Sequence, residues 1–392
     1  MNIALVINSL SRGGAEKNLA LLANHWAADN HQVTIFTFQP QRTLPAFTLE
    51  PSISYQGLDL TTRGYTGFRK LMRLIQLPLK LRKALLAARP AVVVSFMDQT
   101  NILCLMALLG TRIPVIVAER VNPAYSSLCE PEKPFWLRQP ATRLRNIIYR
   151  LAAKIVVLTG DTINYFPAAI QGKCCVIPNP ILAPEKQTAD LTLPKPCIMA
   201  MGRLVPQKRF DLLLRAFAKT AQKQPTWSLV IVGQGPKHAA LEEEIARLNL
   251  RGRAFLPGAT KTPYGVLRQA DLFVLCSDYE GFPGALGEAM ACGLPVIATD
   301  CDYGPREMIK SGWNGMLIKT GDADALAAAL EELMLNSSKR RELGANAAAV
   351  INRFSLKEFI KRWNQILDEI HQCQESSSLK PLLRRQLPQS PK

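Results

Sequence analysis

Short apolar runs alternate with amphipathic stretches along most of this chain, and the alternation predicts strands and helices in turn. In the first half, strand-like runs cover residues 3–7, 32–38, 91–96, 114–118 and 154–158, and a helical pattern covers 15–28. The pattern then restarts, with strands at 197–201, 228–232, 272–276 and 296–299 and helices at 210–222 and 241–248. Strands that are apolar on both faces and separated by helices belong to parallel sheets with helices on each side. We therefore predict an α/β fold.

The repeat of this pattern divides the chain into two similar halves. Five prolines between residues 178 and 196 predict an interdomain linker, and 392 residues exceed what one hydrophobic core usually supports. The predicted parts are an N-terminal Rossmann-like domain at 1–178, a linker at 179–196, a C-terminal Rossmann-like domain at 197–353, a final helix at 354–371 and a flexible tail at 372–392. Two such domains leave a cleft between the carboxyl ends of their strands, where ligands of these folds bind.

Composition narrows the class of protein. Hydrophobic residues make up 48% of the chain and charged residues 20%, which excludes intrinsic disorder. The nine cysteines form no C-x-x-C pair and the four histidines have no ligand-like spacing, so we expect reduced thiols in a cytoplasmic protein and no zinc site. The apolar run at 102–118 contains Arg112 and Pro114 and is too short for a membrane span. The first residues predict a strand rather than a signal peptide.

The net charge of +17 suggests an anionic partner. Eight basic residues and no acidic one lie between Arg63 and Arg89, interleaved with leucines. A basic amphipathic segment of this kind suits the anionic inner face of the plasma membrane, at roughly 1 kcal/mol per cation near the surface. The alternative is a solvated helix face in a basic protein. Nucleic acid is not expected, because no zinc-finger, RNP-like or basic-zipper pattern is present.

The segment Glu280-Gly-Phe-Pro-Gly-Ala-Leu-Gly-Glu288 carries the strongest chemical signal. It follows a predicted strand and leads into a helix-like stretch. A glycine-rich turn between a strand and a helix directs backbone N–H groups and the positive end of the helix dipole at an anion. The two glutamates could hold hydroxyl groups, so the segment suits a ligand made of phosphates and sugars.

Further motifs accompany this one in a fixed order. They are Gly13-Gly14-Ala15-Glu16, Gly202-Arg203-Leu204 followed by Lys208, Ala291-Cys292-Gly293-Leu294-Pro295-Val296-Ile297, and Gly304-Pro305-Arg306-Glu307. Together they resemble the retaining glycosyltransferases of family 4, which have the GT-B fold and an E-x7-E motif. The resemblance covers most of the chain. It implies two Rossmann-like domains that face each other across a cleft, and a final helix that crosses back onto the N-terminal domain.

The resemblance also implies a role for each residue of the donor site. Arg203 and Lys208 would stabilise the departing diphosphate, because fixed cations lower the barrier where negative charge develops. Glu288 would accept hydrogen bonds from the ribose, and Glu280 would lie near the donor sugar and the reacting centre. The backbone groups expected to contact the nucleotide sugar belong to Gly14, Gly233, Gly258, Gly284, Ala285 and Leu286. Surface cations at a helix start, and a glutamate that only complements a helix dipole, are the structural alternatives.

The resemblance implies no metal and no other cofactor, so we interpret Asp300-Cys301-Asp302 as structural. One departure concerns the histidine that many family members place after a strand of the first domain. The comparable segment here is Glu119-Arg120-Val121-Asn122-Pro123, which has no histidine. With Ser95-Phe96-Met97-Asp98-Gln99-Thr100-Asn101, it is similar to relatives that add hexosamines in lipid-linked glycan synthesis. Glu119 and Arg120 are therefore the candidates for the acceptor side or the reacting centre.

The expected function is transfer of a hexose or N-acetylhexosamine from a nucleotide diphosphate sugar, with UDP favoured. The acceptor would be a glycan or a polyprenyl-lipid-linked oligosaccharide at the cytoplasmic membrane surface. A retaining glycosidase that uses Glu280 and Glu288 is one alternative, which requires carboxyl groups ~5 Å apart but has no use for Arg203 and Lys208. A basic, non-catalytic binding protein is the other, and it leaves the E-x7-E segment unexplained.

Overall fold

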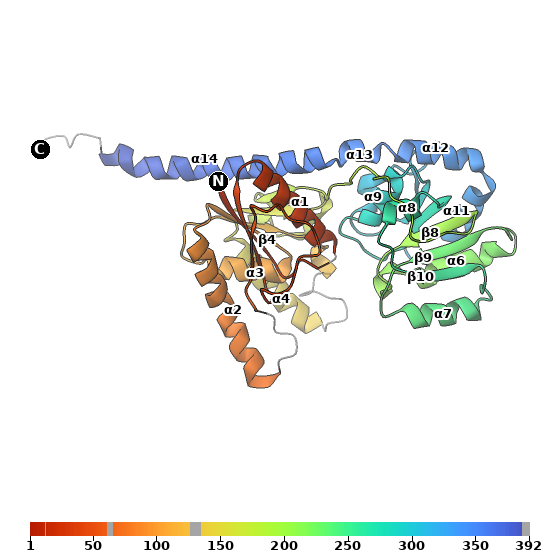
Figure 1. The fold of residues 1–392 in the computed structure, drawn as a ribbon, viewed down its shortest axis with the longest axis horizontal. Helices are drawn as coiled ribbons and strands as arrows, with labels where there is room; N and C mark the ends of the chain where they lie inside the picture. The colour runs from red at the N-terminus through yellow and green to blue at the C-terminus, as the bar shows by residue number, and fades with distance from the viewer. Residues whose placement is uncertain (12, 61–65, 126–134, 386–392) are drawn as a thin grey trace, which may run out of the picture. The chain divides into compact units, whose positions relative to one another are not determined.

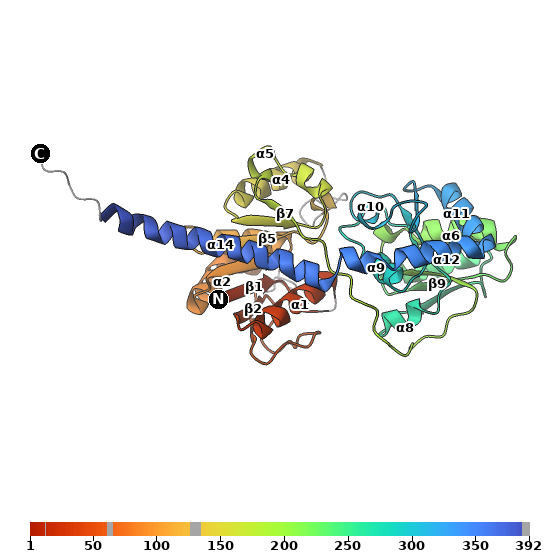
Figure 2. The same ribbon diagram turned by 90° about the horizontal axis from the view of Figure 1, so that it is seen from above.

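The chain folds into two compact α/β units in this computed structural model, which describes residues 1–11, 13–60, 66–125 and 135–385. One unit comprises Met1–Ile177 with Lys357–Lys392, and the other comprises Pro178–Leu356. Figures 1 and 2 show the helices and strands of each unit. Residues 63–65, where the predicted basic segment begins, lie outside the described residues.

The N-terminal unit is built on a seven-stranded sheet whose paired strands are all parallel. Its order is β3-β2-β1-β4-β5-β6-β7. The strands are β1 Asn2–Ile7, β2 Gln32–Thr37, β3 Ser54–Gly57, β4 Val92–Phe96, β5 Val115–Ala118, β6 Lys154–Val157 and β7 Cys174–Val176. Strand order reverses between β1 and β4, because β1 pairs with β2 on one side and with β4 on the other.

Helices cover both faces of this sheet (Figure 1). On one face lie α2 Gly67–Ala88, α3 Asp98–Ala107 and α4 Phe135–Tyr149, with the short α5 Ala168–Gln171 near α4. On the other lie α1 Gly14–Ala28 and the long C-terminal helix α14 Leu356–Arg385. Apolar side chains of α2 to α4 pack against the strands in one core that includes Leu81, Leu105, Val117 and Tyr149.

Trp363 fixes α14 on this unit. Its wholly buried ring stacks on Phe96 with centroids 6.0 Å apart and meets Trp26 of α1 edge-on at 6.2 Å. Arg362 Nη1 also donates to the carbonyl of Val176 at 3.1 Å. The helix continues to Arg385, beyond the end at 371 that the sequence predicts, and so includes part of the stretch predicted as a tail. Once a helix is nucleated, adding polar residues with good helix propensity costs little free energy.

The C-terminal unit contains a six-stranded parallel sheet in the order β10-β9-β8-β11-β12-β13. Its strands are β8 Cys197–Met201, β9 Ser228–Val232, β10 Ala254–Gly258, β11 Leu272–Leu275, β12 Val296–Thr299 and β13 Met316–Ile318. Its helices are α6 Phe210–Ala221, α7 His238–Arg247, α8 Pro263–Leu267, α9 Gly284–Ala291, α10 Pro305–Met308, α11 Ala323–Leu335, α12 Ser337–Ala347 and α13 Val350–Arg353. Both sheets therefore have the doubly wound arrangement, which confirms the predicted fold class.

The proline-rich segment at 178–196 lies along the C-terminal unit. Ile181 N–H donates to the carbonyl of Phe354 at 2.8 Å, and Arg268 donates to the carbonyls of Pro184 and Glu185. Because proline itself lacks an N–H group, such a segment forms no continuous strand ladder and is held by separate backbone and side-chain hydrogen bonds. Over the part of the chain that the structure describes, no helix has the length and apolar character that crossing a membrane requires.

Candidate active site

The loops after β8 and β11 meet where strand order in the C-terminal sheet reverses. These two strands pair directly, although α6, β9, α7, β10 and α8 lie between them in the chain. The loops that follow them, residues 202–208 and 276–283, therefore start at the same edge of the sheet. In doubly wound folds, ligands bind at this point of reversal, outside the carboxyl ends of the strands.

Lys208 and Glu280 form an ion pair between these loops. Lys208 ends the short 3-10 helix Pro206–Lys208, and its Nζ donates to Glu280 Oε1 at 2.5 Å. The side chains are only 16% and 8% exposed, so water screens their attraction weakly. The cation predicted for the diphosphate and the carboxylate predicted for the sugar are thus brought side by side.

Two buried hydroxyl groups hold Glu280 in place. Ser277 Oγ donates to the same Oε1 at 2.6 Å, and Thr299 Oγ1, at the end of β12, donates to the Ser277 carbonyl at 2.7 Å. The side-chain hydrogen bonds from Lys208 and Ser277 both go to Oε1, and none to Glu280 Oε2 is found within the described ranges. Neither Ser277 nor Thr299 was predicted from the sequence. A run of polar residues directly after each strand is the signal that could have identified them.

Further hydrogen bonds join the two loops on either side of the ion pair. Gln207 Nε2 donates to the Tyr279 carbonyl at 2.6 Å, and the Asp278 N–H donates to the Gln207 carbonyl at 2.9 Å. Arg209 Nη1 donates to Asp278 Oδ1 at 2.9 Å. Because backbone and side-chain groups both participate, the loops hold the geometry of Lys208 and Glu280 before any ligand arrives.

Glycines allow the ends of β8, β9 and β10 to approach one another closely. Gly202 N–H donates to the carbonyl of Val232 at 3.0 Å, and Gly233 N–H donates to that of Gly258 at 2.8 Å. A Cβ atom on Gly233 would lie 1.8 Å from the carbonyl oxygen of Gly202. Gly258 has a φ of 90°, which favours glycine. Backbone contacts thus connect Gly258 to Gly233 and Gly233 to Gly202, which lies next to the Lys208 side chain.

Helix α9 begins with Gly284, Ala285 and Leu286, the residues whose N–H groups are predicted to contact the donor. First-turn N–H groups have no acceptor within their own helix. Glu288, one turn further along, is half-buried. Burial of the neighbouring Tyr264 hydroxyl raises its pKa, and the charge of Glu288 raises it further. Gly287 is required here by packing, since a Cβ atom would lie 2.5 Å from Ile181 Cδ1.

The remaining predicted residues of this unit take different positions. Arg203 is exposed, and no ion pair to its side chain is found among the described residues. Asp300 pairs with Arg306 at 2.9 Å, and Asp302 bridges through its backbone to Tyr279. Within the described ranges we find no group of three or more histidine, cysteine or acidic side chains arranged to hold a metal. Gly14 belongs to the N-terminal unit, where it opens α1.

Glu119 and Arg120 follow β5 in the N-terminal unit and point to opposite faces of the sheet. Glu119 is 2% exposed and accepts a hydrogen bond from Tyr149 Oη on the α4 side. Burial raises the pKa of Glu119 to about 7, although the nearby Arg145 guanidinium opposes the shift. Tyr149 is itself buried, and burial followed by the charge of Glu119 raises its pKa. Glu119 is therefore a core residue of this unit.

Arg120 is enclosed by aromatic rings on the α14 side. Its guanidinium carbon lies 4.6 Å from the ring centroid of Phe96 and 5.5 Å from that of Trp363. Burial lowers the pKa of Arg120 to about 9. Stacking of a cation on aromatic faces offsets part of this desolvation. The structure therefore separates the two residues that the sequence groups together, and encloses both.

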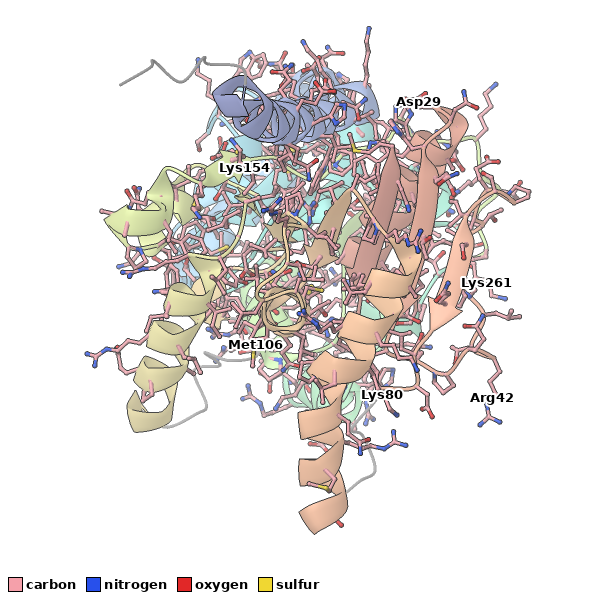
Figure 3. All side chains as sticks on the ribbon, turned by 90° about the vertical axis from the view of Figure 1, so that its left-hand side faces the viewer. Asp29, Arg42, Lys80, Met106, Lys154 and Lys261 are labelled. Carbon is pink, nitrogen blue, oxygen red and sulfur yellow. The ribbon has the colours of Figure 1, made fainter. Side chains whose placement is uncertain are left out.

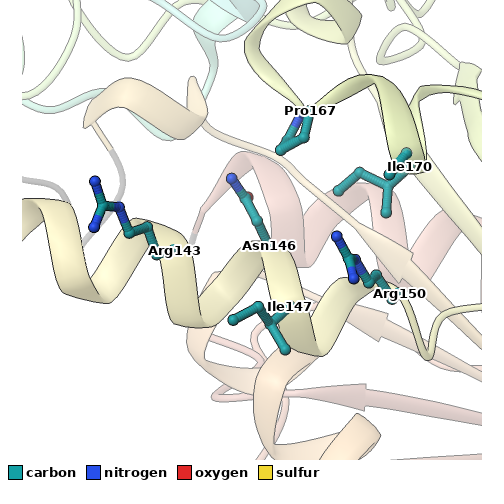
Figure 4. A pocket seen from close by; sticks show the side chains of 7 residues that line it. Arg143, Asn146, Ile147, Arg150, Pro167 and Ile170 are labelled. Atoms are coloured by element: carbon teal, nitrogen blue, oxygen red, sulfur yellow. The ribbon is translucent and has the colours of Figure 1, made fainter.

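A basic and apolar surface covers the helices on the α2 to α4 side of the N-terminal unit. α2 and α4 contain no acidic residue. Exposed apolar side chains lie on or beside these helices, at Leu79, Met106, Leu109, Leu144, Ile147 and Leu151. Lys80 and Met106 are labelled on this side of the unit in Figure 3. Between α4 and α5, an open pocket of about 250 Å³ is lined by Arg143, Ile147, Arg150 and Ile170 among others (Figure 4).

The sequence matches two families of protein domains, one in each unit. Residues 13–180 match the glycosyl transferase 4-like domain, and residues 184–350 match the glycosyl transferases group 1. The chain belongs to the glycosyltransferases with the GT-B fold. One relative of this glycosyltransferase is GalNAc-alpha-(1->4)-GalNAc-alpha-(1->3)-diNAcBac-PP-undecaprenol alpha-1,4-N-acetyl-D-galactosaminyltransferase from Campylobacter jejuni. The two are 28% identical over 373 residues, which cover 94% of this chain and 99% of the relative.

Solved structures agree with the fold of this glycosyltransferase. Sucrose-phosphate synthase from Thermosynechococcus elongatus superposes with a TM-score of 0.80 at 19% identity, covering 95% of this chain and 99% of that one. Anabaena Alr3699/HepE in complex with UDP and glucose superposes with a TM-score of 0.74 at 21% identity, covering 93% and 99%. At these identities the likeness concerns the fold.

Proposed function

We propose that this glycosyltransferase transfers a hexose or N-acetylhexosamine from a UDP-sugar to a glycan or polyprenyl-diphosphate-linked oligosaccharide, with retention of anomeric configuration and without a metal. The observation that carries the proposal is the Lys208–Glu280 pair at the point of strand reversal. The Campylobacter relative, an N-acetylgalactosaminyltransferase whose name gives a PP-undecaprenol-linked glycan, supports the class of acceptor. The Anabaena structure, which binds UDP and glucose, supports the class of donor.

The donor would lie across the carboxyl ends of β8 and β11. Lys208 and Arg203 would contact the diphosphate, Arg203 through its planar guanidinium and Lys208 as a point charge. The first turn of α9 would add N–H groups, and Glu288 would accept from the ribose hydroxyls. Gly233 and Gly258 would border the nucleotide. Glu280 Oε2 would accept from a hydroxyl of the sugar, while Oε1 remains with Lys208 and Ser277.

Transfer would proceed mainly through positioning and electrostatics. As the bond between the sugar and the diphosphate breaks, negative charge grows on the departing phosphate, where Lys208 and Arg203 stabilise it. That phosphate would take the proton of the attacking acceptor hydroxyl on the same face of the sugar, which retains the configuration. Holding both reactants in this geometry removes much of the entropic barrier of a bimolecular reaction.

We place the enzyme at the cytoplasmic face of the plasma membrane, attached through the basic segment at 63–89 and the adjoining helices. The exposed leucines of α2 and α4 and the absence of acidic residues in both helices support contact with anionic lipid. A lipid-linked acceptor would reach the protein from the same surface.

A transfer assay with stereochemical readout tests the proposed reaction. The purified enzyme is supplied in EDTA with UDP-GalNAc, UDP-GlcNAc or UDP-glucose and a GalNAc-terminated undecaprenyl-diphosphate glycan, and the product is examined by NMR. We expect one donor to give an α-linked product. A β-linked product from an α-donor contradicts retention, and activity that returns only with Mg²⁺ or Mn²⁺ contradicts metal independence.

A further inference from the structure

The open pocket between α4 and α5 belongs entirely to the N-terminal unit, and the proposed transfer reaction does not use it. Its volume of about 250 Å³ is below the ~300–1,000 Å³ of sites that enclose drug-sized ligands. A group of the size of a lipid headgroup is therefore a better match. On one side the lining comes from Arg143, Asn146 and Arg150, and on the other from Pro167, Ala169 and Ile170 (Figure 4).

The polar residues of this lining lie on one face of α4. Arg143, Asn146 and Arg150 are spaced i, i+3 and i+7, and residues at this spacing are neighbours on a helix surface. Both arginines are exposed, and neither guanidinium has an ion pair or a hydrogen bond within the described ranges. Asn146 Oδ1 accepts from Arg145 Nη2 at 3.4 Å. Two guanidinium groups that point to one pocket suit phosphate oxygens, which their planar forks match in geometry.

The charge around the pocket has one sign. Asp161 is the only acidic residue between positions 133 and 184, and it is not part of the lining. Lys173 Nζ donates to the carbonyls of Arg150 and Ala152, at 2.6 Å and 2.8 Å. A cation therefore compensates the negative end of the α4 dipole, which would otherwise disfavour an anion near the end of this helix.

An apolar stripe runs beside the basic face of α4. It consists of Leu144, Ile147 and Leu151, each one position after a polar residue of the pocket, and their side chains are 58%, 59% and 51% exposed. A soluble phosphate has nothing to offer these side chains. An anionic phospholipid satisfies both features, because its phosphate lies at the membrane surface directly above the acyl chains.

We propose that the pocket between α4 and α5 binds the phosphate of an anionic phospholipid headgroup, with Arg143 and Arg150 as its cations. The apolar stripe then enters the boundary between headgroups and acyl chains. The inference deepens the proposed membrane attachment and rests on it, because it gives that attachment a specific site in addition to the general charge of α2.

Three variants test the site. Arg143→Gln/Arg150→Gln removes both cations at exposed positions, and circular dichroism melting checks that the fold is unchanged. Ala169→Leu reduces the pocket without changing the charge. Arg42→Gln/Arg251→Gln removes two exposed arginines away from the pocket and is the matched control. Co-sedimentation of the full chain is measured with vesicles of phosphatidylcholine alone, with phosphatidylglycerol added, or with undecaprenyl diphosphate added.

We expect the wild type to bind the vesicles that contain phosphatidylglycerol. Arg143→Gln/Arg150→Gln should bind them roughly 10- to 100-fold more weakly, the scale of two charge-assisted contacts to phosphate. Ala169→Leu should also bind more weakly, although an added leucine by itself favours contact with a membrane. The control should change binding by less than about threefold, because exposed charges further than a Debye length of ~10 Å are screened.

Equal losses in the arginine pair and the control would assign the effect to net charge and overturn the proposal. Wild-type binding by Ala169→Leu would also overturn it, because the arginines would then act at the open surface. A loss confined to vesicles with undecaprenyl diphosphate would replace the phospholipid by the lipid carrier of the acceptor. A wild type that does not bind phosphatidylglycerol contradicts the proposed membrane attachment itself, and this is seen before any variant is compared.

Discussion

Lys208 and Glu280 are 72 positions apart in the chain, yet Lys208 Nζ donates to Glu280 Oε1 at 2.5 Å. The contact exists because β8 and β11 are neighbours in the sheet, so that their loops begin side by side. Ser277 fixes the same carboxylate oxygen, and Gln207 joins the loops next to it. A donor that binds here meets a cation and a carboxylate whose positions are already set.

Glu280→Gln should impair transfer much more than nucleotide binding. The substitution preserves an oxygen for the Ser277 hydroxyl but removes the charge that pairs with Lys208 and that we propose binds the sugar. We expect kcat to fall by roughly 10²-fold, the scale of losing one preorganised electrostatic contact. UDP affinity should remain near that of the wild type. Glu331→Gln, which removes a surface partner of Lys223, is the matched control. Unchanged transfer in Glu280→Gln would remove this residue from the reacting centre.

Gly233→Ala should destabilise the C-terminal unit. The added Cβ would lie 1.8 Å from a backbone oxygen of Gly202, so the loops after β8 and β9 must separate. We expect a loss of roughly 2–4 kcal/mol in the free energy of unfolding, measured by urea titration, together with weaker UDP binding. Gly160→Ala, where a Cβ atom meets nothing within 4 Å, should change stability by less than ~0.5 kcal/mol. Equal midpoints for the two variants would contradict the close approach.

Glu119 should make the stability of the enzyme depend on pH. Its pKa is about 7 in the folded protein against 4.5 for the unfolded reference. Between these values the unfolded chain releases the proton while the folded protein retains it, so the free energy of unfolding should fall as pH rises from about 4.5 to about 7. Glu119→Gln, which mimics the protonated form, should flatten this slope in denaturant titrations at several pH values. A slope as steep as that of the wild type would show that Glu119 does not titrate in this range.

Membrane attachment should depend on the basic surface of α2. Each cation near an anionic membrane contributes about 1 kcal/mol to binding. Reversal of two exposed cations in Lys80→Glu/Lys83→Glu should therefore reduce co-sedimentation with vesicles that contain phosphatidylglycerol by roughly tenfold or more. Lys186→Glu/Lys261→Glu makes the same charge change in the C-terminal unit and serves as the control. Equal binding by both double variants would assign attachment to net charge alone.

The sequence predicts the interior strands of both sheets and misses their edges. The four strands absent from the sequence pattern, β3, β7, β10 and β13, are the outermost strands of the two sheets. Interior strands are apolar and buried on both faces, whereas β3 and β10 expose alternate residues and β7 and β13 are partly exposed. A short alternating run cannot be distinguished from a loop by its composition.

The candidate site shows a similar division. Glycines and charges next to strand ends identify Lys208 and Glu280 individually, but their pairing depends on strand order, which the sequence pattern does not specify. Burial is harder still to predict. Charged neighbours such as Glu119 and Arg120 normally face solvent after a strand, and the groups that enclose them, Tyr149 and Trp363, come from distant helices.

The most direct test of the donor site is calorimetric titration of wild type and Lys208→Ala with UDP, GDP and ADP in EDTA. We predict selective binding of UDP by the wild type without metal, and a loss of roughly 10- to 100-fold in affinity for Lys208→Ala, the worth of one charge-assisted contact to phosphate. Lys223→Ala, which removes an exposed cation of the same unit, should bind UDP as the wild type does. Near-wild-type UDP affinity in Lys208→Ala would contradict the account.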